Sequence, residues 1–182
     1  MGILEPDMGP DLAIKSLGEI VKQYPKTKLH IVGGAEKDLK VMKNLAQKLN
    51  IDSAVIFYGF VQDNNKMAEI VRSCYIGLAP YRAFPHSKRW YGDAGKIRQY
   101  IASGLPVVTT HVPPLGRDIV AKGAGVMTKD TVEDFSKGII TLLSDEKLYK
   151  KLARVAEKIS KNNTWENVYA QAFKDMKNLE NS

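Results

Sequence analysis

The fold of this chain is decided by one stretch of sequence: Gly95-Lys96-Ile97-Arg98-Gln99-Tyr100-Ile101-Ala102-Ser103-Gly104-Leu105-Pro106-Val107-Val108-Thr109-Thr110. The apolar residues Ile97, Tyr100 and Ile101 recur at helical spacing, which predicts a helix with one buried face. Gly104 can adopt a positive φ where that helix ends, and Pro106 can open a strand but cannot continue a helix. The stretch therefore predicts a helix, a tight turn and a buried β-branched strand in direct succession.

Polar side chains occupy the remaining positions of this helix. Lys96, Arg98 and Gln99 are available to face solvent or a ligand. Open α/β sheets bind ligands in a crevice at the carboxyl ends of their strands, next to helices of this kind. An ordinary helix-to-strand connection with nothing bound is the alternative that spacing alone leaves open.

Helical and strand patterns alternate along the rest of the chain, which predicts an α/β fold with a Rossmann-like, mostly parallel open sheet and helices on both faces. The expected helices span Asp11–Tyr24, Glu36–Leu49, Met67–Cys74, Val132–Leu143, Glu146–Lys161 and Trp165–Leu179, and the last has Thr164 as its cap with Asn167 at the third helical position. The expected strands span Lys28–Gly34, Val55–Gly59, Tyr75–Pro80, Val107–Thr110 and Gly123–Met127. Two segments are expected to be loops: Tyr81–Asp93, rich in aromatic and basic residues, and the Pro-rich His111–Asp118.

Composition indicates a single globular domain. The chain has 182 residues, of which 44% are hydrophobic and 26% charged, and no apolar run approaches the ~20 residues of a membrane span. Asp7, Pro10 and Asp11 interrupt the first residues, so no signal peptide is evident. We therefore expect a cytoplasmic location, with a position at the inner face of the membrane left open.

The net charge of +7 suits a phosphate-bearing ligand, an anionic membrane surface or nucleic acid. No basic stretch interleaved with stacking aromatics and no helix-turn-helix pattern is present, so we expect no nucleic-acid partner. The helix Glu146–Lys161 has one apolar stripe and many lysines. This helix is expected either to pack on the domain core or to lie on a membrane as a peripheral anchor.

The potential metal ligands are few and scattered. Cys74 is the single cysteine, which rules out an internal disulfide and a cysteine-based zinc site. His30, His86 and His111 lack the spacing of a metal site. We expect neither a metal nor another cofactor.

The stretch that begins at Gly95 resembles the lysine-x-x-glutamate-tyrosine-x-alanine-x-glycine-x-proline-valine-valine signature of retaining GT-B glycosyltransferases of the large group 1 family. Further marks of that family occur in the same order, and the resemblance runs from the first residues to about Trp165: Gly2–Gly9, Leu29–Gly34, Val55–Val61 and Ile76–Pro80. In such enzymes two Rossmann-like domains face each other, one for the nucleotide-sugar donor and one for the acceptor. The resemblance implies that residues 1–182 form the carboxy-terminal donor domain, with its last helix in 162–182, and that the amino-terminal acceptor domain is absent.

The resemblance also implies an activity: transfer of a sugar from a nucleoside diphosphate sugar to a glycan, a lipid or another acceptor, with retention and without a metal. Polysaccharide biosynthesis is the setting it suggests, and this chain alone would be inactive. The positions that match the family's donor site fall into three groups: Lys96, Gly2 and Gly95 for the diphosphate; Gln99, Tyr91, Gly92 and Asp93 for the ribose or sugar; Gly59, Phe60 and Val61 for the base. The catalytic group is unknown.

Several positions depart from the family's pattern. Gln99 replaces a glutamate that accepts from the ribose, and Tyr91 stands where a second glutamate is usual. The two cations of the opening loop are replaced by Ile3 and Met8, although charge builds on the leaving diphosphate during the reaction. A carboxylate at Asp93 would repel phosphates.

These departures leave three interpretations. Lys88 or Arg89, from the loop Tyr81–Asp93, would substitute for the missing cations in a working transferase. A degenerate domain that serves as a binding or assembly module is the second interpretation. The third is a sugar-nucleotide epimerase of GT-B shape. Such an enzyme would need catalytic carboxylates and a histidine in the crevice, and His111 could be that histidine.

The amino terminus leads to one more expectation. The family's first strand is central in its sheet, and here only Met1 precedes Gly2. A shortened central strand leaves backbone groups of its neighbours unpaired, at a cost of about 1–3 kcal/mol for each buried group. We expect residues upstream of Met1, or a partner that covers the gap.

Overall fold

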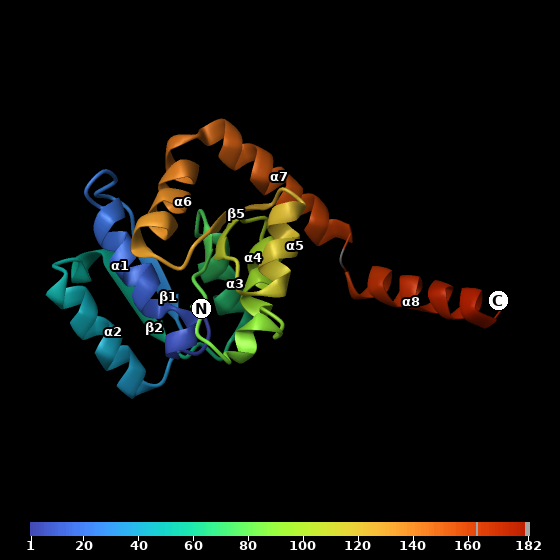
Figure 1. The fold of residues 1–182 in the computed structure, drawn as a ribbon, viewed down its shortest axis with the longest axis horizontal. Helices are drawn as coiled ribbons and strands as arrows, with labels where there is room; N and C mark the ends of the chain where they lie inside the picture. The colour runs from blue at the N-terminus through green and yellow to red at the C-terminus, as the bar shows by residue number, and fades with distance from the viewer. Residues whose placement is uncertain (163, 181–182) are drawn as a thin grey trace.

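The computed structural model describes residues 1–162 and 164–180, and it has the expected α/β architecture of parallel strands flanked by helices (Figure 1). The strands form two hydrogen-bonded groups. The first pairs β1 (Leu29–Val32) with β2 (Val55–Gly59), and the second has the order β3 (Gly77–Ala79), β4 (Val107–Thr110), β5 (Gly125–Thr128). All three pairings are parallel, as the alternation of helices and strands requires.

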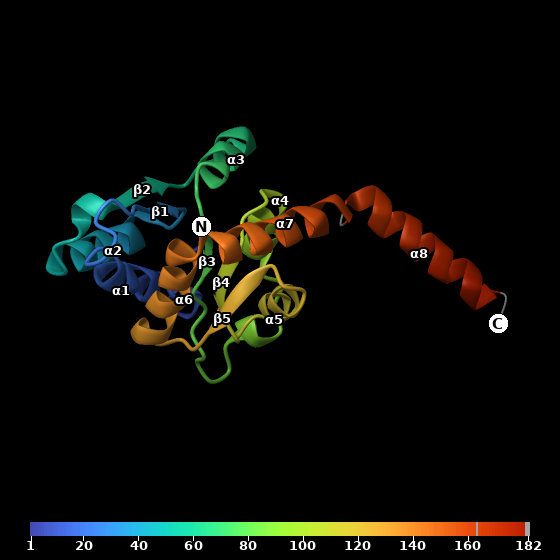
Figure 2. The same ribbon diagram turned by 90° about the horizontal axis from the view of Figure 1, so that it is seen from above.

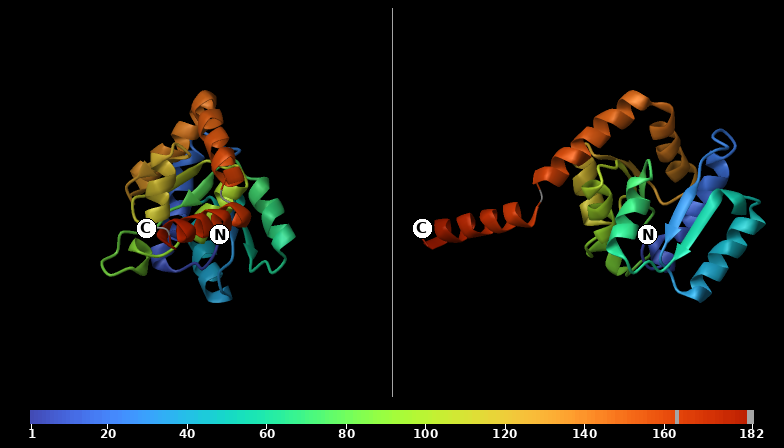
Figure 3. Two further views of the ribbon diagram at one scale, coloured as in Figure 1. Left: turned by 90° about the vertical axis from the view of Figure 1, so that its right-hand side faces the viewer. Right: turned by 180° about the vertical axis from the view of Figure 1, so that it is seen from behind.

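Eight α-helices connect and cover the strands within the described residues: α1 (Pro10–Ile20), α2 (Glu36–Lys48), α3 (Asn64–Arg72), α4 (Gly95–Ala102), α5 (Pro114–Ala121), α6 (Val132–Ser144), α7 (Glu146–Asn162) and α8 (Trp165–Glu180). Figures 1 and 3 show α8 extending away from the body of the domain. The cap expected at its start is confirmed, because the backbone N–H of Asn167 donates to Thr164 Oγ1 at 3.3 Å. No helix within the described ranges is both long enough and apolar enough to cross a bilayer.

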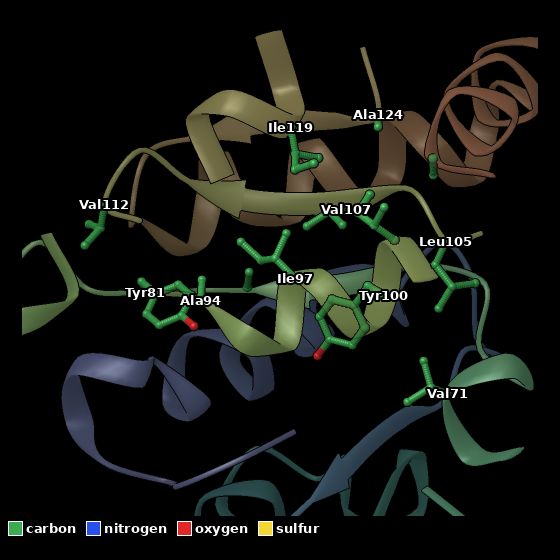
Figure 4. Close-up of a cluster of buried hydrophobic side chains, with 13 residues drawn as sticks. Val71, Tyr81, Ala94, Ile97, Tyr100, Leu105, Val107, Val112, Ile119 and Ala124 are labelled. Carbon is green, nitrogen blue, oxygen red and sulfur yellow. The ribbon is translucent and has the colours of Figure 1, made fainter. Parts of the chain in front are cut away.

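The strand β4 is covered on both faces. Its residues Val107 and Val108 are both fully buried, and successive side chains of a strand point to opposite faces. Val107 packs with Ile97 of α4 and Ile119 of α5 (Figure 4). Val108 packs instead with residues of α1 and α6, among them Phe135. This division confirms helices on both faces of the sheet.

The single continuous sheet that the sequence predicts is interrupted between β1 and β3, and Figure 2 shows the two strand groups on either side of the N-terminus. The opening segment lies between them, but it is not a strand. It makes one ladder-like bond, from the Gly2 N–H to Val32 O at 2.8 Å, and a 3₁₀ turn, Pro6–Met8, follows. A largely apolar cavity of about 380 Å³ remains beside it, lined by residues of β1 such as Ile31 and by Leu78 of β3.

Two sequence predictions need correction. The expected loop His111–Asp118 is a short bend followed by α5, because Pro114 occupies the first helical position, where a missing N–H costs nothing. The helix expected at Met67–Cys74 begins earlier, at Asn64, because the Asp63 carboxylate caps it by accepting from the backbone N–H groups of Asn65 and Lys66. Other boundaries differ from the predicted ones by a few residues, and β2 matches its predicted range.

The Tyr100 hydroxyl closes part of the gap between the sheets. The β3–β4 register directs Gly77 and Ala79 toward β4, so the main-chain groups of Leu78 point to the cavity side. Tyr100 Oη donates to Leu78 O at 3.2 Å, and the ring is buried. We expect Tyr100→Phe to lower the free energy of unfolding by about 1–2 kcal/mol, because that carbonyl loses its donor.

Denaturant unfolding measures this loss, with Tyr91→Phe as the control, since Tyr91 is 90% exposed. An equal loss in both variants would show that the Leu78 bond is not its cause.

Gly9 holds the opening loop against the end of β3. It has φ +68°, and a Cβ there would collide with the Pro80 carbonyl oxygen. Gly123 has a similar φ of +81°, but no atom lies within 4 Å of the position that its Cβ would take. Gly9→Ala should therefore lower the free energy of unfolding by roughly 1–3 kcal/mol more than Gly123→Ala does. Both substitutions strain the backbone, but only an alanine at position 9 also collides with a neighbour.

Thermal or urea unfolding of the two alanine variants makes the comparison. Equal destabilisation would mean that the loop moves away from Pro80 without cost.

Candidate functional site

The carboxyl ends of β1 and β3 meet at the opening loop, residues 2–9. After β1, a Cβ at Gly33 would collide with the backbone of Gly2. After β3, Pro80 touches Gly9, and the Arg82 N–H donates to Asp7 O at 3.0 Å. The loop thus joins the two strand groups at the edge where open α/β sheets place their ligands.

Asp7 connects the opening loop to the long loop after β3. Its Oδ2 accepts from Ser87 Oγ at 2.9 Å and from Arg89 Nε at 3.2 Å. The same guanidinium donates through Nη2 to Glu5 Oε2 at 2.9 Å. Oδ1 of Asp7 is buried, and no described residue donates a hydrogen bond to it. Arg89 is therefore held in place by two carboxylates, whereas the neighbouring Lys88 is exposed.

Lys96 lies in the first turn of α4 beside this network. Its ammonium sits over the ring of Tyr81, with Nζ 4.7 Å from the ring centroid. Part of the side chain remains accessible, yet the ammonium is surrounded by protein. Burial lowers the pKa of Lys96 to about 8, with a further lowering from the Arg89 charge and an opposing effect of Asp7. Arg89 and Lys96 are therefore close enough for their charges to interact.

The N-terminus of α4 is free to accept an anion. No side chain caps it, and its first turn contains no acidic residue, so its orphan N–H groups and the positive end of the helix dipole are available. Gly95 opens this turn, with nothing within 4 Å of the position its Cβ would take. The Asp93 carboxylate, which the family resemblance places near the donor phosphates, accepts from Arg98 Nε at 3.0 and 3.1 Å.

The other predicted donor-site residues lie around these groups to differing degrees. Gln99 is exposed on α4, one turn after Lys96. Tyr91 is 90% exposed at the end of a 3₁₀ turn, Lys88–Trp90, and the Gly92 N–H donates back to Lys88 O at 2.9 Å. No hydrogen bond or ion pair among the described residues joins Tyr91 or Gly92 to Lys96, so their place in a sugar site stays a prediction.

The predicted base-binding turn follows β2. Gly59 has φ +65°, and its carbonyl accepts from the Gly33 N–H at 2.6 Å. Phe60 is 81% exposed, and Val61 is partly exposed beside it. Because β1 and β2 are parallel, this turn and Gly33 lie at the same edge of the sheet as the opening loop.

Sequence reasoning missed two contributors to the site. Tyr81 lies two residues after the end of β3, and that position was a usable signal because open α/β sheets bind ligands at the carboxyl ends of their strands. Asp7 carried no such signal, since its partner Arg89 is 82 residues away in the chain. His111 contacts the tilted ring of Trp90, with 5.4 Å between the ring centroids.

No group of three His, Cys, Asp or Glu side chains that would suit a metal is found in residues 1–162 and 164–180. The expectation that the reaction uses no metal stays a prediction.

The buried charge of Lys96 predicts a stability change. At pH 7 the folded state holds a charged ammonium whose pKa is about 8, against 10.5 for the ordinary group. We expect Lys96→Met to raise the free energy of unfolding by about 1–2 kcal/mol at pH 7, after allowing for partial solvent screening. Between pH 8 and 10.5 the unfolded wild type binds more protons than the folded state, so its stability rises and the difference shrinks.

Urea unfolding of both proteins at pH 7 and pH 10 measures this change, with Lys122→Met, directly after α5, as an exposed control. A Lys96→Met variant that is less stable than wild type at pH 7 would contradict the expectation.

Comparison with known proteins identifies the family. The family described as glycosyl transferases group 1 matches residues 1–159. The poly(glycerol-phosphate) alpha-glucosyltransferase of Bacillus subtilis is 26% identical over 162 residues, which are 85% of this chain and 22% of that protein. The mannosylfructose-phosphate synthase of Agrobacterium fabrum is 27% identical over 181 residues, 94% of this chain and 38% of the synthase. The chain thus spans well under half the length of these relatives.

Solved structures agree on the fold. The C-terminal domain of the group 1 glycosyl transferase LpcC from Francisella tularensis superposes with a TM-score of 0.76 at 21% identity, over 90% of this chain and 83% of that domain. The Anabaena protein Alr3699/HepE, solved in complex with UDP, superposes with a TM-score of 0.76 at 19% identity, over 100% of this chain and 48% of that protein. This chain belongs to the group 1 glycosyltransferase family and has the architecture of a GT-B glycosyltransferase domain.

Proposed function

We propose that this chain is the donor-binding half of a retaining glycosyltransferase and binds a nucleoside diphosphate sugar. The observation that carries the proposal is a pair of cations in one partly dehydrated site: Lys96, with its lowered pKa, and Arg89, whose charge contributes to that lowering. Lys96 lies in the first turn of α4, whose N-terminus no side chain caps. Two cations and a set of free N–H groups are the complement of a diphosphate.

These groups have a clear part in the proposed chemistry. As the bond between the sugar and the diphosphate breaks, negative charge grows on the leaving phosphate, and fixed positive charge nearby lowers the barrier. A bound diphosphate would raise the pKa of Lys96 again and keep it protonated. Gln99 can accept from a ribose hydroxyl through its amide oxygen, without the charge of a glutamate. Arg89 replaces the cations that Ile3 and Met8 do not supply.

Two relatives help to choose the first ligand and the partner domain. The Anabaena protein was solved with UDP, so uridine diphosphate is the first nucleotide to test. We propose that a second Rossmann-like domain, amino-terminal in its enzyme, holds the glycan or lipid acceptor. In support, α8 carries Tyr169, Phe173 and Met176 at helical spacing, each more than half exposed, which suits packing against another domain.

A second candidate function is a binding or assembly module without transfer activity. It is favoured by the carboxylates of Glu5 and Asp7, which already neutralise the Arg89 guanidinium. A diphosphate would have to compete with them. The exposed Ile3 at the position of a family cation agrees with this interpretation.

Calorimetric titration with UDP, GDP and ADP separates the two candidates. We expect one nucleotide to bind saturably, and we expect Lys96→Met and Arg89→Met each to weaken binding about 10–100-fold, as loss of a charged hydrogen-bonding partner does. Wild-type affinity should fall as pH rises through about 8, where Lys96 loses its proton. The Lys96→Met variant should lack this pH dependence.

Lys122→Met serves as the matched control, because it removes an exposed lysine directly after α5. Absence of binding by all three nucleotides at millimolar concentration, in a protein with normal circular dichroism, would favour the module without transfer activity.

A further inference from the structure

The helix α7 has two faces with different surroundings. Leu152 and Ala156 are buried, and Val155 and Ile159 pack against the cluster around α4. The apolar stripe of this helix therefore packs on the domain core, as one of the two sequence interpretations predicts. It is not available to enter a membrane.

An exposed face of α7 beside the apolar stripe carries a row of cations. Lys147, Lys151, Arg154 and Lys158 follow one another at spacings of four, three and four residues, which places them on a single line along the helix. All four are exposed. Within the described part of the chain, no carboxylate lies within 4.0 Å of their charged groups, unlike Lys150 and Lys161, which pair with Glu146 and Glu157. We call these four residues the basic stripe.

The helix α7 carries a large share of the net positive charge of the chain. It contains six basic and two acidic residues in 17 positions, whereas the net charge of all 182 residues is +7. Solvated protein surfaces usually intersperse both signs, which limits self-repulsion. A line of four unpaired cations, about 16 Å long at 1.5 Å per residue, instead creates a local positive potential that attracts a polyanion.

We propose that the basic stripe docks this domain on an anionic lipid bilayer. The helix α7 lies at the outside of the domain (Figures 1 and 3). Its four cations follow one line along the helix and are exposed, so a flat surface can meet all four side chains together. Their long flexible stems suit lipid headgroups, which need no fixed geometry. The nearby aromatic Tyr149 stacks on Tyr75 with 3.7 Å between ring centroids. Single-stranded nucleic acids bind by stacking their bases on exposed aromatic rings. The Tyr149 ring is already stacked on Tyr75, so it does not provide such a platform.

Vesicle co-sedimentation tests the proposal. The protein is mixed at about 0.15 M salt with phosphatidylcholine vesicles that contain about one third phosphatidylglycerol, and with vesicles of phosphatidylcholine alone. We expect binding to the anionic vesicles only, and a fall in affinity on the order of a thousandfold in the variant with Lys147→Gln, Lys151→Gln, Arg154→Gln and Lys158→Gln. Glutamine keeps the helix propensity of lysine and arginine, so the fold should be retained.

A matched variant removes the same charge from a different helix. Lys37→Gln, Lys40→Gln, Lys43→Gln and Lys48→Gln on α2 are exposed substitutions of equal number, and they should leave most of the vesicle binding intact. Equal losses in both variants would overturn the proposal, because net charge and not the stripe would then cause binding. It would also be overturned by no binding at about 0.15 M salt, or by stripe-dependent binding to duplex DNA but not to vesicles.

The proposal does not depend on the donor site. We expect the stripe variant to titrate with nucleotides as the wild type does, so failure of vesicle binding and failure of nucleotide binding can be told apart.

Discussion

The carboxylate of Asp7 is the contact on which the candidate site depends. It accepts from Ser87 and Arg89, while its own main-chain carbonyl accepts from the Arg82 N–H. These bonds join the opening loop to the loop after β3 across the two strand groups, which are not hydrogen-bonded to each other. Desolvation of both charges offsets much of their attraction in a part-buried ion pair, so the pair contributes more to geometry than to net stability. This contact fixes the position of Arg89, whose charge helps to lower the pKa of Lys96.

The site keeps positive charge where burial opposes it. Desolvation lowers the pKa of Lys96, and the Tyr81 ring and the Asp7 charge offset only part of that cost. A protein selected for stability alone would place an apolar side chain there. Strongly perturbed groups in a crevice are typical of binding and catalytic sites, because the missing stabilisation is supplied by the ligand. The family membership and the electrostatics of the site therefore agree.

Local patterns were sufficient to predict much of the fold. The strand β4 and the helix α4 follow from β-branched and helical spacing next to Gly104 and Pro106, and β4 is buried at every position. The start of α5 was missed because two adjacent prolines are typical of loops, although Pro114 is tolerated in a first helical turn. The Asp7–Arg89 pair and the Tyr100–Leu78 bond join residues that are distant in the chain. Such pairs depend on tertiary packing and leave no local periodicity to detect.

The basic stripe on α7 and Lys96 at the start of α4 differ in their exposure to water and salt. Lys147, Lys151, Arg154 and Lys158 are exposed, so added salt screens their attraction for a distant surface over a Debye length of about 8 Å at physiological ionic strength. Lys96 is surrounded by protein, and charges in such an environment are screened much less. Added salt should therefore weaken the attraction of α7 for an anionic surface at lower concentrations than it weakens the attraction of Lys96 for a diphosphate. Because α7 packs directly on α4, one rigid unit would carry both the proposed surface contact and the proposed donor site.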